Sequence, residues 1–275
     1  MIKPRKSLGQ NFLIDQNIIR KIIDVFNPFP GDLVLEIGPG TGALTEHLLK
    51  SDLKLYAIEL DERAFSYLNE RYPNYKHNYF KLYNEDILEF DLKRIPDLAF
   101  GEKLNVIGNI PYNLSSEIFF WLFNNREVIN KAQLMIQREV GQRLNAKVRT
   151  KNYGILTIAM ELSGYCRHLF DVSPNCFNPV PKVTSSIIEM SFNSKISKQD
   201  FDGIMKIVRQ AFNQRRKTLR NSLSAFLSSF GDYTSDFIIK AESELTRDIF
   251  TKRPEELTSD EFALLYKLSV EIKNQ

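Results

Sequence analysis

Residues 33–42 read Leu33-Val34-Leu35-Glu36-Ile37-Gly38-Pro39-Gly40-Thr41-Gly42, a short and mainly apolar run followed by a glycine-rich turn. The run has the length of a buried strand, and the turn leads into residues 43–49, whose pattern suits a helix. A second strand is expected at residues 55–59. A strand, a glycine turn, a helix and another strand form the opening unit of a doubly wound α/β sheet.

Strands and helices continue to alternate through the first two-thirds of the chain. Further strands are expected at residues 78–82, 104–107, 133–136 and 186–192, and further helices at residues 18–26 and 115–123. This alternation predicts an α/β fold with a doubly wound sheet. Ligands of such sheets bind beyond the carboxyl ends of the strands, so the glycine turn is expected to line a binding site.

The pattern changes from about residue 194, where helices replace the alternation. The clearest helices are expected at residues 201–212, 219–226 and 259–272. Thr258 followed by Glu261 is a capping-box signal at the start of the last one. We place the domain boundary between residues 193 and 200, and predict a sheet-containing domain at residues 1–195 and a small all-helical domain at residues 196–275.

The composition is that of a globular protein without a membrane span. The chain has 275 residues, of which 43% are hydrophobic, and this is enough to bury a full core. It has no apolar run of the roughly 18 residues that a span requires, and its start lacks the apolar segment of a signal peptide. A cytoplasmic protein is therefore expected.

Neither metal chemistry nor a catalytic triad is indicated. Cys166 and Cys176 lack the spacing of metal ligands, and the three histidines, His47, His77 and His168, suggest no triad. The net charge of +3 is only mildly basic, so charge alone does not establish a nucleic-acid partner.

Residues 109–112 read Asn109-Ile110-Pro111-Tyr112 and form a device that can present an aromatic amine to an electrophile. The Asn109 side-chain carbonyl and the backbone carbonyl before Pro111 can accept hydrogen bonds from an amino group, and Tyr112 offers a stacking face. The amino lone pair of adenine is delocalised into its ring, and two acceptors would localise it for attack. The predicted target is a nucleobase.

The glycine turn by itself is compatible with two cofactors. Gly38 and Gly40 with Ala43 satisfy the loose dinucleotide fingerprint, and Glu59 lies where an acidic residue can bind ribose hydroxyls. These two features also fit a dehydrogenase that uses a nicotinamide cofactor. Glu36-x-Gly38-x-Gly40-x-Gly42 equally matches the nucleoside-binding turn of methyltransferases. The motif at Asn109 favours the methyltransferase, because hydride transfer needs no pair of acceptors for an amine.

Five motifs, in order, resemble those of the KsgA-type small-subunit rRNA adenine N6-dimethyltransferases. They are residues 6–13 (Lys-Ser-Leu-Gly-Gln-Asn-Phe-Leu), the glycine motif at 35–42, Asn84-Glu85-Asp86-Ile87, residues 109–112, and residues 177–185 (Phe-Asn-Pro-Val-Pro-Lys-Val-Thr-Ser). Residues 137–143 depart from the family pattern, which leaves the RNA contacts less defined than the chemistry. The resemblance implies a class I methyltransferase with a Rossmann-like sheet at residues 1–195 and an RNA- or ribosome-binding domain at 196–275.

The resemblance also implies a cofactor, S-adenosyl-L-methionine, and roles for single residues. Asp86 is expected to bind the adenine of the cofactor, and Glu59 its ribose hydroxyls. Phe177 is expected to face Tyr112 with the target base between them. The expected cofactor-binding residues are Asn11, Leu13, Gly38, Gly40, Glu59, Leu60, Asp86, Ile87 and Asn109, and the expected catalytic residues are Asn109, Ile110, Pro111, Tyr112 and Phe177.

Local basic clusters are the candidates for RNA binding. Residues 206–220 contain six basic and no acidic side chains, and residues 3–6 and 147–151 supply two further patches. Such groups engage phosphates and give salt-sensitive affinity with little sequence reading. The expected RNA-binding residues are Lys6, Lys147, Arg149, Lys182, Arg209, Arg215, Arg216, Lys217 and Arg220.

The expected reaction is dimethylation of N6 in two adjacent adenosines of the 3′-terminal hairpin of 16S rRNA. By resemblance the substrate is an immature small ribosomal subunit, and the enzyme is a monomer that needs no metal. Two alternatives remain beside the dehydrogenase: a related large-subunit rRNA adenine methyltransferase, and an assembly factor that binds RNA without catalysis.

Overall fold

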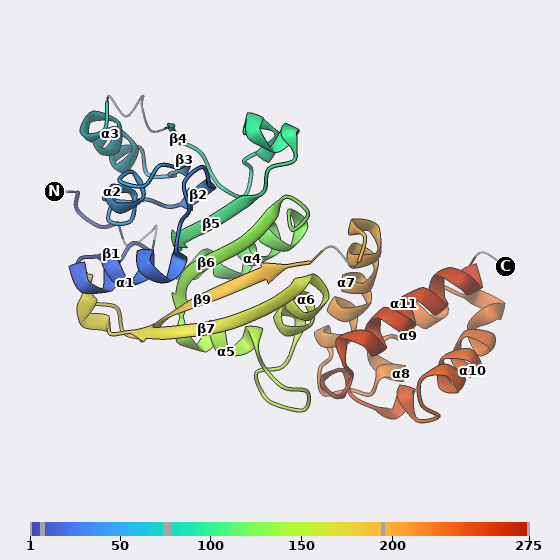
Figure 1. Cartoon of the computed structure of the whole chain (residues 1–275). Coiled ribbons are helices and arrows are strands. Elements are labelled where there is room, and N and C mark those ends of the chain that lie inside the picture. Colours follow the sequence, from blue (N-terminus) through green and yellow to red (C-terminus); the bar gives the residue numbers. More distant parts are fainter. Residues whose placement is uncertain (1, 6–8, 74–78, 194–195, 274–275) are drawn as a thin grey trace. The chain divides into compact units, whose positions relative to one another are not determined.

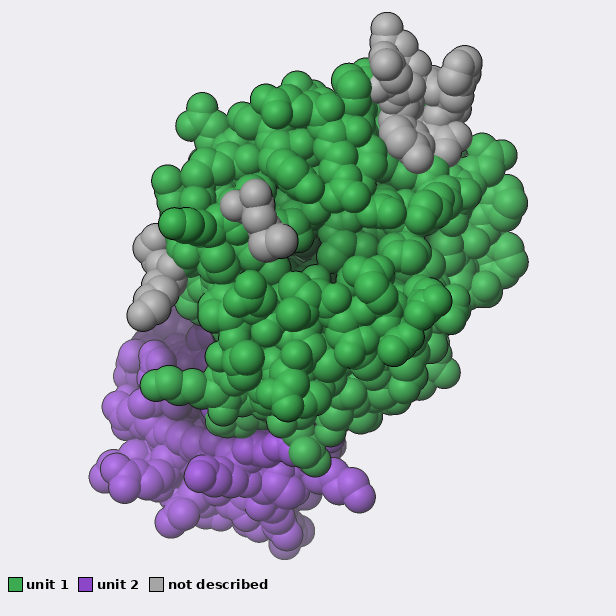
Figure 2. Space-filling model, turned by 90° about the vertical axis from the view of Figure 1, so that its left-hand side faces the viewer, with its two compact units in different colours: residues 1–141, 165–193 green, residues 142–164, 194–275 purple. Residues whose placement is uncertain are grey.

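The computed structural model describes residues 2–5, 9–73, 79–193 and 196–273 (Figure 1). The chain forms two compact units, coloured in Figure 2: unit 1 comprises residues 1–141 and 165–193, and unit 2 comprises residues 142–164 and 194–275. The division predicted from the sequence differs from this one at residues 142–164. These residues pack with the C-terminal helices although they precede the last strands of the sheet in the chain.

Unit 1 is built on a seven-stranded sheet with the order β4-β3-β2-β5-β6-β9-β7. The pairs β4–β3, β3–β2, β2–β5 and β5–β6 are parallel, and β9 is antiparallel to β6. The strands are β2 (Leu33–Ile37), β3 (Lys54–Ile58), β4 (Phe80–Tyr83), β5 (Leu104–Asn109), β6 (Ile129–Gln137), β7 (Gly164–Val172) and β9 (Ser185–Phe192).

The strand order reverses between β2 and β5. The chain runs outward from β2 to β3 and β4, and then returns to β5, from which it continues in the opposite direction to β6. Because crossovers between parallel strands are right-handed as a rule, α2 (Thr45–Leu48) and α3 (Glu62–Arg71) are expected on one face of the sheet and α4 (Ser115–Asn124) on the other. The carboxyl ends of β2 and β5 therefore border a crevice, the usual place for a ligand in such sheets.

The core lies on both faces of this sheet. Helix α1 (Gln16–Phe26) begins at Asp15, whose carboxylate accepts from two backbone N–H groups, and it buries Ile19, Ile22 and Phe26 against the strands. The two central strands approach each other closely at the crevice. A Cβ added to Gly108 of β5 would lie 2.6 Å from the Ile37 carbonyl oxygen of β2, so only glycine allows this approach.

A second, two-stranded sheet joins segments that are far apart in the sequence. Strand β1 (Phe12–Leu13) pairs antiparallel with β8 (Phe177–Asn178), with Leu13 opposite Phe177. The pairing brings the motif near the N-terminus next to the motif at residues 177–185. Both segments therefore belong to unit 1 and lie beside the large sheet.

Unit 2 consists of helices. Helix α5 (Arg138–Leu144) leads into it, and its own helices are α6 (Ile155–Ser163), α7 (Lys198–Asn213), α8 (Leu219–Ser222), α9 (Ser224–Ser228), α10 (Thr234–Glu244) and α11 (Ser259–Lys273). The single helix expected at residues 219–226 is two short helices. The predicted capping box is confirmed, because the Thr258 N–H donates to Glu261 and the Glu261 N–H donates to the Thr258 hydroxyl.

Short 3₁₀ helices complete the fold: η2 (Leu92–Arg94), η3 (Pro96–Phe100), η4 (Tyr112–Leu114), η5 (Pro174–Cys176), η6 (Gly231–Tyr233), η7 (Ile249–Thr251) and η8 (Pro254–Glu256). None of the helices in the described part of the chain is both long and apolar enough to cross a bilayer.

Candidate active site

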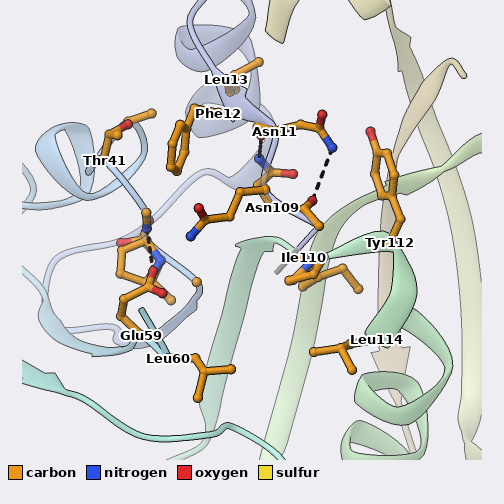
Figure 3. A pocket seen from close by; sticks show the side chains of 18 of the residues that line it. Asn11, Phe12, Leu13, Thr41, Glu59, Leu60, Asn109, Ile110, Tyr112 and Leu114 are labelled. Carbon is orange, nitrogen blue, oxygen red and sulfur yellow. Dashed lines mark hydrogen bonds between the residues drawn. The ribbon is translucent and has the colours of Figure 1, made fainter. Parts of the chain in front are cut away.

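A cavity of about 320 Å³ opens at the crevice between the carboxyl ends of the parallel strands. Figure 2 shows a hollow on the face of unit 1 that is turned to the viewer, and Figure 3 shows the cavity from close by. Its volume is within the range of small-molecule sites. Four loops that follow β2, β3, β4 and β5 line it, together with the N-terminal segment at residues 9–13.

The glycine turn and the end of β3 are joined by hydrogen bonds. The Gly40 N–H donates to Glu59 Oε2 at 2.8 Å, and the Asp61 N–H donates to Glu59 Oε1 at 2.8 Å. Gly38 and Gly40 have φ of 65° and 58°, the left-handed region that glycine adopts without strain. Each carboxylate oxygen has a further lone pair, so Glu59 can still accept hydrogen bonds from a ligand.

The cavity has an acidic lining. Glu36, Glu59 and Asp86 all line it, whereas none of the described lining residues is Lys or Arg. Glu36 is 1% exposed and accepts from the Thr45 hydroxyl at 2.7 Å. Burial raises the pKa of the Glu36 carboxyl to about 8, and the nearby Glu59 adds to the shift. Glu36 is therefore protonated at neutral pH, and the carboxyl groups of Glu59 and Asp86, with no Lys or Arg among the described lining residues, favour a cationic or neutral ligand over one that carries phosphates.

Asn109 lies at the end of β5 and points its amide into the cavity. Its Nδ2 donates to the Asn11 carbonyl oxygen at 3.0 Å. This bond uses the amide nitrogen and leaves Oδ1 as an acceptor for a ligand. Figure 3 shows Asn109, Asn11 and Tyr112 around the same space.

The N-terminal segment is fastened at a second point, the buried carboxylate of Asp61. Gln10 Nε2 donates to Asp61 Oδ2 at 2.9 Å, and Arg63 Nη2 donates to the same oxygen at 2.6 Å. Arg63 Nη1 also donates to the Lys3 carbonyl oxygen at 3.0 Å. The Arg63 hydrogen bonds are the main cause that lowers the pKa of Asp61 to about 2.

The Tyr112 side chain is held by its hydroxyl. Tyr112 lies in η4, lines the cavity, and has its hydroxyl 2.6 Å from Ser185 Oγ. Burial raises the pKa of this phenol, and the Ser185 hydrogen bond opposes the shift. An amide acceptor and an aromatic ring therefore stand side by side at the end of β5, next to an acidic cavity.

Comparison with known proteins identifies the family. The family model for ribosomal RNA adenine dimethylase matches residues 1–250. The chain belongs to the ribosomal RNA adenine dimethylase family. The predictions of the family and of the fold are thereby confirmed, and the enzyme is a methyltransferase that uses S-adenosylmethionine.

Individual relatives agree with this assignment. The chain is 39% identical to the ribosomal RNA small subunit methyltransferase A of Bacteroides thetaiotaomicron, over 96% of this chain and 93% of that protein. A dimethyladenosine transferase structure from Plasmodium falciparum has a TM-score of 0.79 at 28% identity, and the match covers 96% of this chain and 98% of that one. The 23S rRNA methyltransferase ErmE shares the fold, with a TM-score of 0.65 at 23% identity over 94% of this chain and 99% of that one.

The residues of the cavity fit the cofactor of this family. S-adenosylmethionine carries a sulfonium charge and no phosphate, which matches the acidic lining. Most residues predicted for the dimethylase site line this one cavity: Asn11, Leu13, Gly38, Gly40, Glu59, Leu60, Asp86, Asn109, Ile110, Pro111 and Tyr112. Ile87 is 7% exposed and does not belong to the lining.

Phe177 does not line the cavity in this structure of the dimethylase. Its side chain is 1% exposed and packs in the core with Leu13, Ile19 and Cys176. The β1–β8 pairing sets Phe177 opposite Leu13, and the apolar ring is buried there rather than on the cavity wall. The ring of Phe177 therefore contributes to the core in this structure, and its facing Tyr112 across a target base stays a prediction.

The predicted RNA-binding residues lie in both units. Lys182 is an exposed residue of unit 1, Lys6 lies outside the described residues, and the others belong to unit 2. The prediction for Arg215 conflicts with its contacts. Its Nε donates to Glu255 at 2.5 Å, and its two terminal nitrogens donate to the Lys151 and Thr150 carbonyl oxygens at 2.9 and 3.0 Å. These bonds make Arg215 a structural link within unit 2.

The sequence-based site list omitted several lining residues of the dimethylase. Gln10, Phe12 and Thr41 lie within the quoted motifs without a predicted role, and the sequence predicts Glu36 only as part of the glycine motif. Asp61 follows Glu59 closely, and only its burial at 2% exposure together with the hydrogen bond from Gln10 shows that it fastens the N-terminal segment. In the described part of the chain, no three His, Cys, Asp or Glu side chains are grouped as for a metal ion.

Proposed function

We propose that this dimethylase methylates N6 of two adjacent adenosines in the 3′-terminal hairpin loop of 16S rRNA, within small ribosomal subunits that are still being assembled. The relatives named small subunit methyltransferase A support the choice of subunit, because the similarity extends over nearly the whole of both chains. The orientation of the Asn109 amide carries the proposal for the chemistry. Its Nδ2 is held by Asn11, which leaves Oδ1 beside Tyr112 as an acceptor for an amino group.

S-adenosylmethionine, when bound, supplies an electrophilic methyl group on a positively charged sulfur. Glu59 would accept from the ribose hydroxyls of the cofactor, because its oxygens retain lone pairs beside Gly40 and Asp61. Asp86 would accept from the adenine amino group; one of its oxygens already accepts from the Leu88 N–H at 2.9 Å. Asn11 and Leu13 would cover the cofactor from the N-terminal segment.

Asn109 and its neighbours prepare the target amine. Asn109 Oδ1 and the Ile110 carbonyl oxygen accept from the two N–H bonds, while the ring of Tyr112 stacks on the base. These acceptors draw the nitrogen toward tetrahedral geometry and localise its lone pair. They would also stabilise the positive charge that the nitrogen gains as its bond to the methyl carbon forms and the carbon–sulfur bond breaks, so no strong base is needed before the proton leaves to water. The product amine retains a lone pair and one hydrogen, so the same residues can serve a second transfer.

RNA affinity would come from the basic residues of both units. We propose phosphate contacts by Lys147, Arg149, Lys182, Arg209, Arg216, Lys217 and Arg220, and action as a monomer that requires no metal. Such contacts position the particle and make binding sensitive to salt, but they do not select a hairpin. Selection of the two adenosines would then depend on the shape of the assembling subunit.

The test is transfer of label from S-adenosylmethionine to immature small subunits that lack the modification. The expected product is N6,N6-dimethyladenosine in the 3′-terminal hairpin, identified by nucleoside mass spectrometry. Asn109→Ala should lower turnover by roughly 100-fold while binding of the particle persists, since one acceptor of the reacting group is lost. Asn105→Ala is the matched control, because Asn105 lies in the same strand and bonds Asn130 rather than the site.

Three outcomes would contradict the proposal or a part of it. Label in large-subunit rRNA would favour the related large-subunit activity. Tight particle binding with no transfer by the parent protein would favour an assembly factor without catalysis. Full turnover by Asn109→Ala would refute the role of the amide even if the substrate is right.

A further inference from the structure

Tyr112 is supported at both ends of its side chain. The Ser115 hydroxyl donates to the Tyr112 backbone carbonyl oxygen at 3.1 Å, and the Leu114 N–H donates to the Pro111 carbonyl oxygen at 3.1 Å. These bonds hold the backbone of η4. The phenol hydroxyl lies 2.6 Å from Ser185 Oγ, so the far end of the ring is also tied.

Ser185 offers a rigid attachment. It is the first residue of β9, is 0% exposed, and lies opposite Gln137 of β6 in the antiparallel pair. The Arg138 N–H donates to the Thr184 carbonyl oxygen at 3.0 Å and extends the pairing by one step. The hydroxyl that holds Tyr112 is therefore fixed to the large sheet rather than to a loop.

A tyrosine ring can turn about its Cβ–Cγ bond, so the contact with Ser185 can determine the tilt of the Tyr112 ring. The torsion that turns the ring about its Cβ–Cγ bond has broad minima, so a ring held only through its backbone can change its tilt. In this structure Phe177 is buried in the core and does not line the cavity, whereas Tyr112 does. For a base stacked on Tyr112, the tilt of the ring determines where the amino group lies relative to Asn109.

We propose that Ser185 is a positioning residue for methyl transfer: its hydroxyl holds the Tyr112 hydroxyl and fixes the ring at the tilt that presents the adenine amine to Asn109. This inference rests on the proposed role of Tyr112 as the stacking wall of the base. Ser185 itself touches neither the base nor the cofactor. It acts only through the ring.

The test is a double-mutant cycle with Ser185→Ala and Tyr112→Phe, assayed with immature small subunits at saturating S-adenosylmethionine. Each single variant removes the same hydroxyl contact and keeps the aromatic face. Each should lower kcat roughly 3- to 10-fold, the range that one net hydrogen bond provides. The KM for the particle should change less than about 2-fold, because phosphate contacts dominate its binding. The double variant should lose no more than either single one.

Ser186→Ala is the matched control for the loss of a buried hydroxyl on β9. Ser186 is 1% exposed, and its hydroxyl donates to Asp171 at 2.6 Å, away from Tyr112. Ser186→Ala should leave kcat at the parent value, whatever it does to the melting temperature. An equal loss of kcat in Ser186→Ala and Ser185→Ala would show a general effect of strand stability and would overturn the proposal.

Tyr112→Ala separates this inference from the proposed function. If Tyr112→Ala has parent activity, the ring is no wall for the base, and both the role of Tyr112 and that of Ser185 fail. If Tyr112→Ala loses activity but the losses of Ser185→Ala and Tyr112→Phe multiply in the double variant, the wall remains and the positioning role of Ser185 is refuted.

Discussion

We predict that Asp61→Asn lowers both the stability of the protein and its affinity for the cofactor. The side chain is buried and accepts hydrogen bonds from Arg63 and Gln10. Asn has nearly the same shape but no charge, so the substitution removes the charge-assisted bonds and leaves the packing in place.

The size of the expected stability loss follows from the pKa of the Asp61 carboxyl. Folding lowers it from 3.8 to about 2, and each pH unit corresponds to about 1.4 kcal/mol, so ionised Asp61 contributes about 2 kcal/mol to the free energy of unfolding. Because the pKa is lower in the folded state, this stabilisation is complete above pH 4 and is lost as the pH falls toward 2. Asp61→Asn should cost about 2 kcal/mol at pH 7, and only about half as much at pH 3.

Urea unfolding of the cofactor-free protein at pH 7 and pH 3 measures both values. Isothermal titration calorimetry with S-adenosylmethionine adds a functional readout. Since Asp61 fastens Gln10 and the segment that lines the cavity, Asp61→Asn should weaken cofactor binding by roughly 5-fold.

Asp97→Asn is the matched control. Asp97 pairs with Lys54 at 2.6 Å and accepts from the Tyr56 hydroxyl, and it does not line the cavity. Its replacement should lower stability without changing cofactor affinity. A stability cost of Asp61→Asn that does not vary between pH 7 and pH 3 would refute the assignment to its charge, and unchanged cofactor affinity would refute the fastening of the segment.

Two further predictions concern single charged residues. Glu36→Gln should make the cofactor-free protein more stable at pH 9, by no more than roughly 5 kcal/mol, because the folded state raises the pKa of Glu36 to about 8 and its ionisation costs stability as pH rises from 4.5. The difference in unfolding free energy between Glu36→Gln and the parent protein should become small near pH 5. Urea unfolding from pH 5 to pH 9 measures this difference, and a difference that does not vary with pH would contradict the prediction. Arg215→Gln should lower the unfolding free energy by about 1–3 kcal/mol through its lost hydrogen bonds, whereas Arg216→Gln should leave stability unchanged and weaken RNA binding with a shallower salt dependence. Melting curves measure the stability of the two variants, and filter binding at several salt concentrations measures their RNA affinity. A stability loss in Arg216→Gln together with weaker RNA binding only in Arg215→Gln would refute the assigned roles.

Local signals in the sequence were sufficient for the central strands. Residues 33–37 form β2 with the predicted bounds, because a short, mainly apolar run before a glycine turn specifies a buried strand. Strand β9 begins one residue before its predicted start, and its apolar residues alternate in part with serine and glutamate. Strand β7 had no such signal. Its residues include the exposed Tyr165, Arg167 and His168, so an edge strand with a polar face gives no apolar run.

The chemistry of the site was also readable from short motifs, since each motif places its groups at the end of one strand. Asn109 ends β5, Tyr112 lies three residues later, and the glycine turn follows β2, so these groups meet once β2 and β5 are neighbours. The contacts of Phe177 and Arg215 depend instead on partners far away in the chain. Phe177 is paired with Leu13 and buried in the same core cluster, and Arg215 donates a hydrogen bond to Glu255.

The sequence by itself therefore determined the family, the sheet and the chemical groups at its carboxyl edge, because these follow from local periodicity and from motifs a few residues long. Only the tertiary structure decided which aromatic ring lies on the cavity wall, which arginine is a structural link, and how Asp61 and Ser185 support the site. Burial and hydrogen-bond partners are set by segments distant in the chain, and no local pattern encodes them.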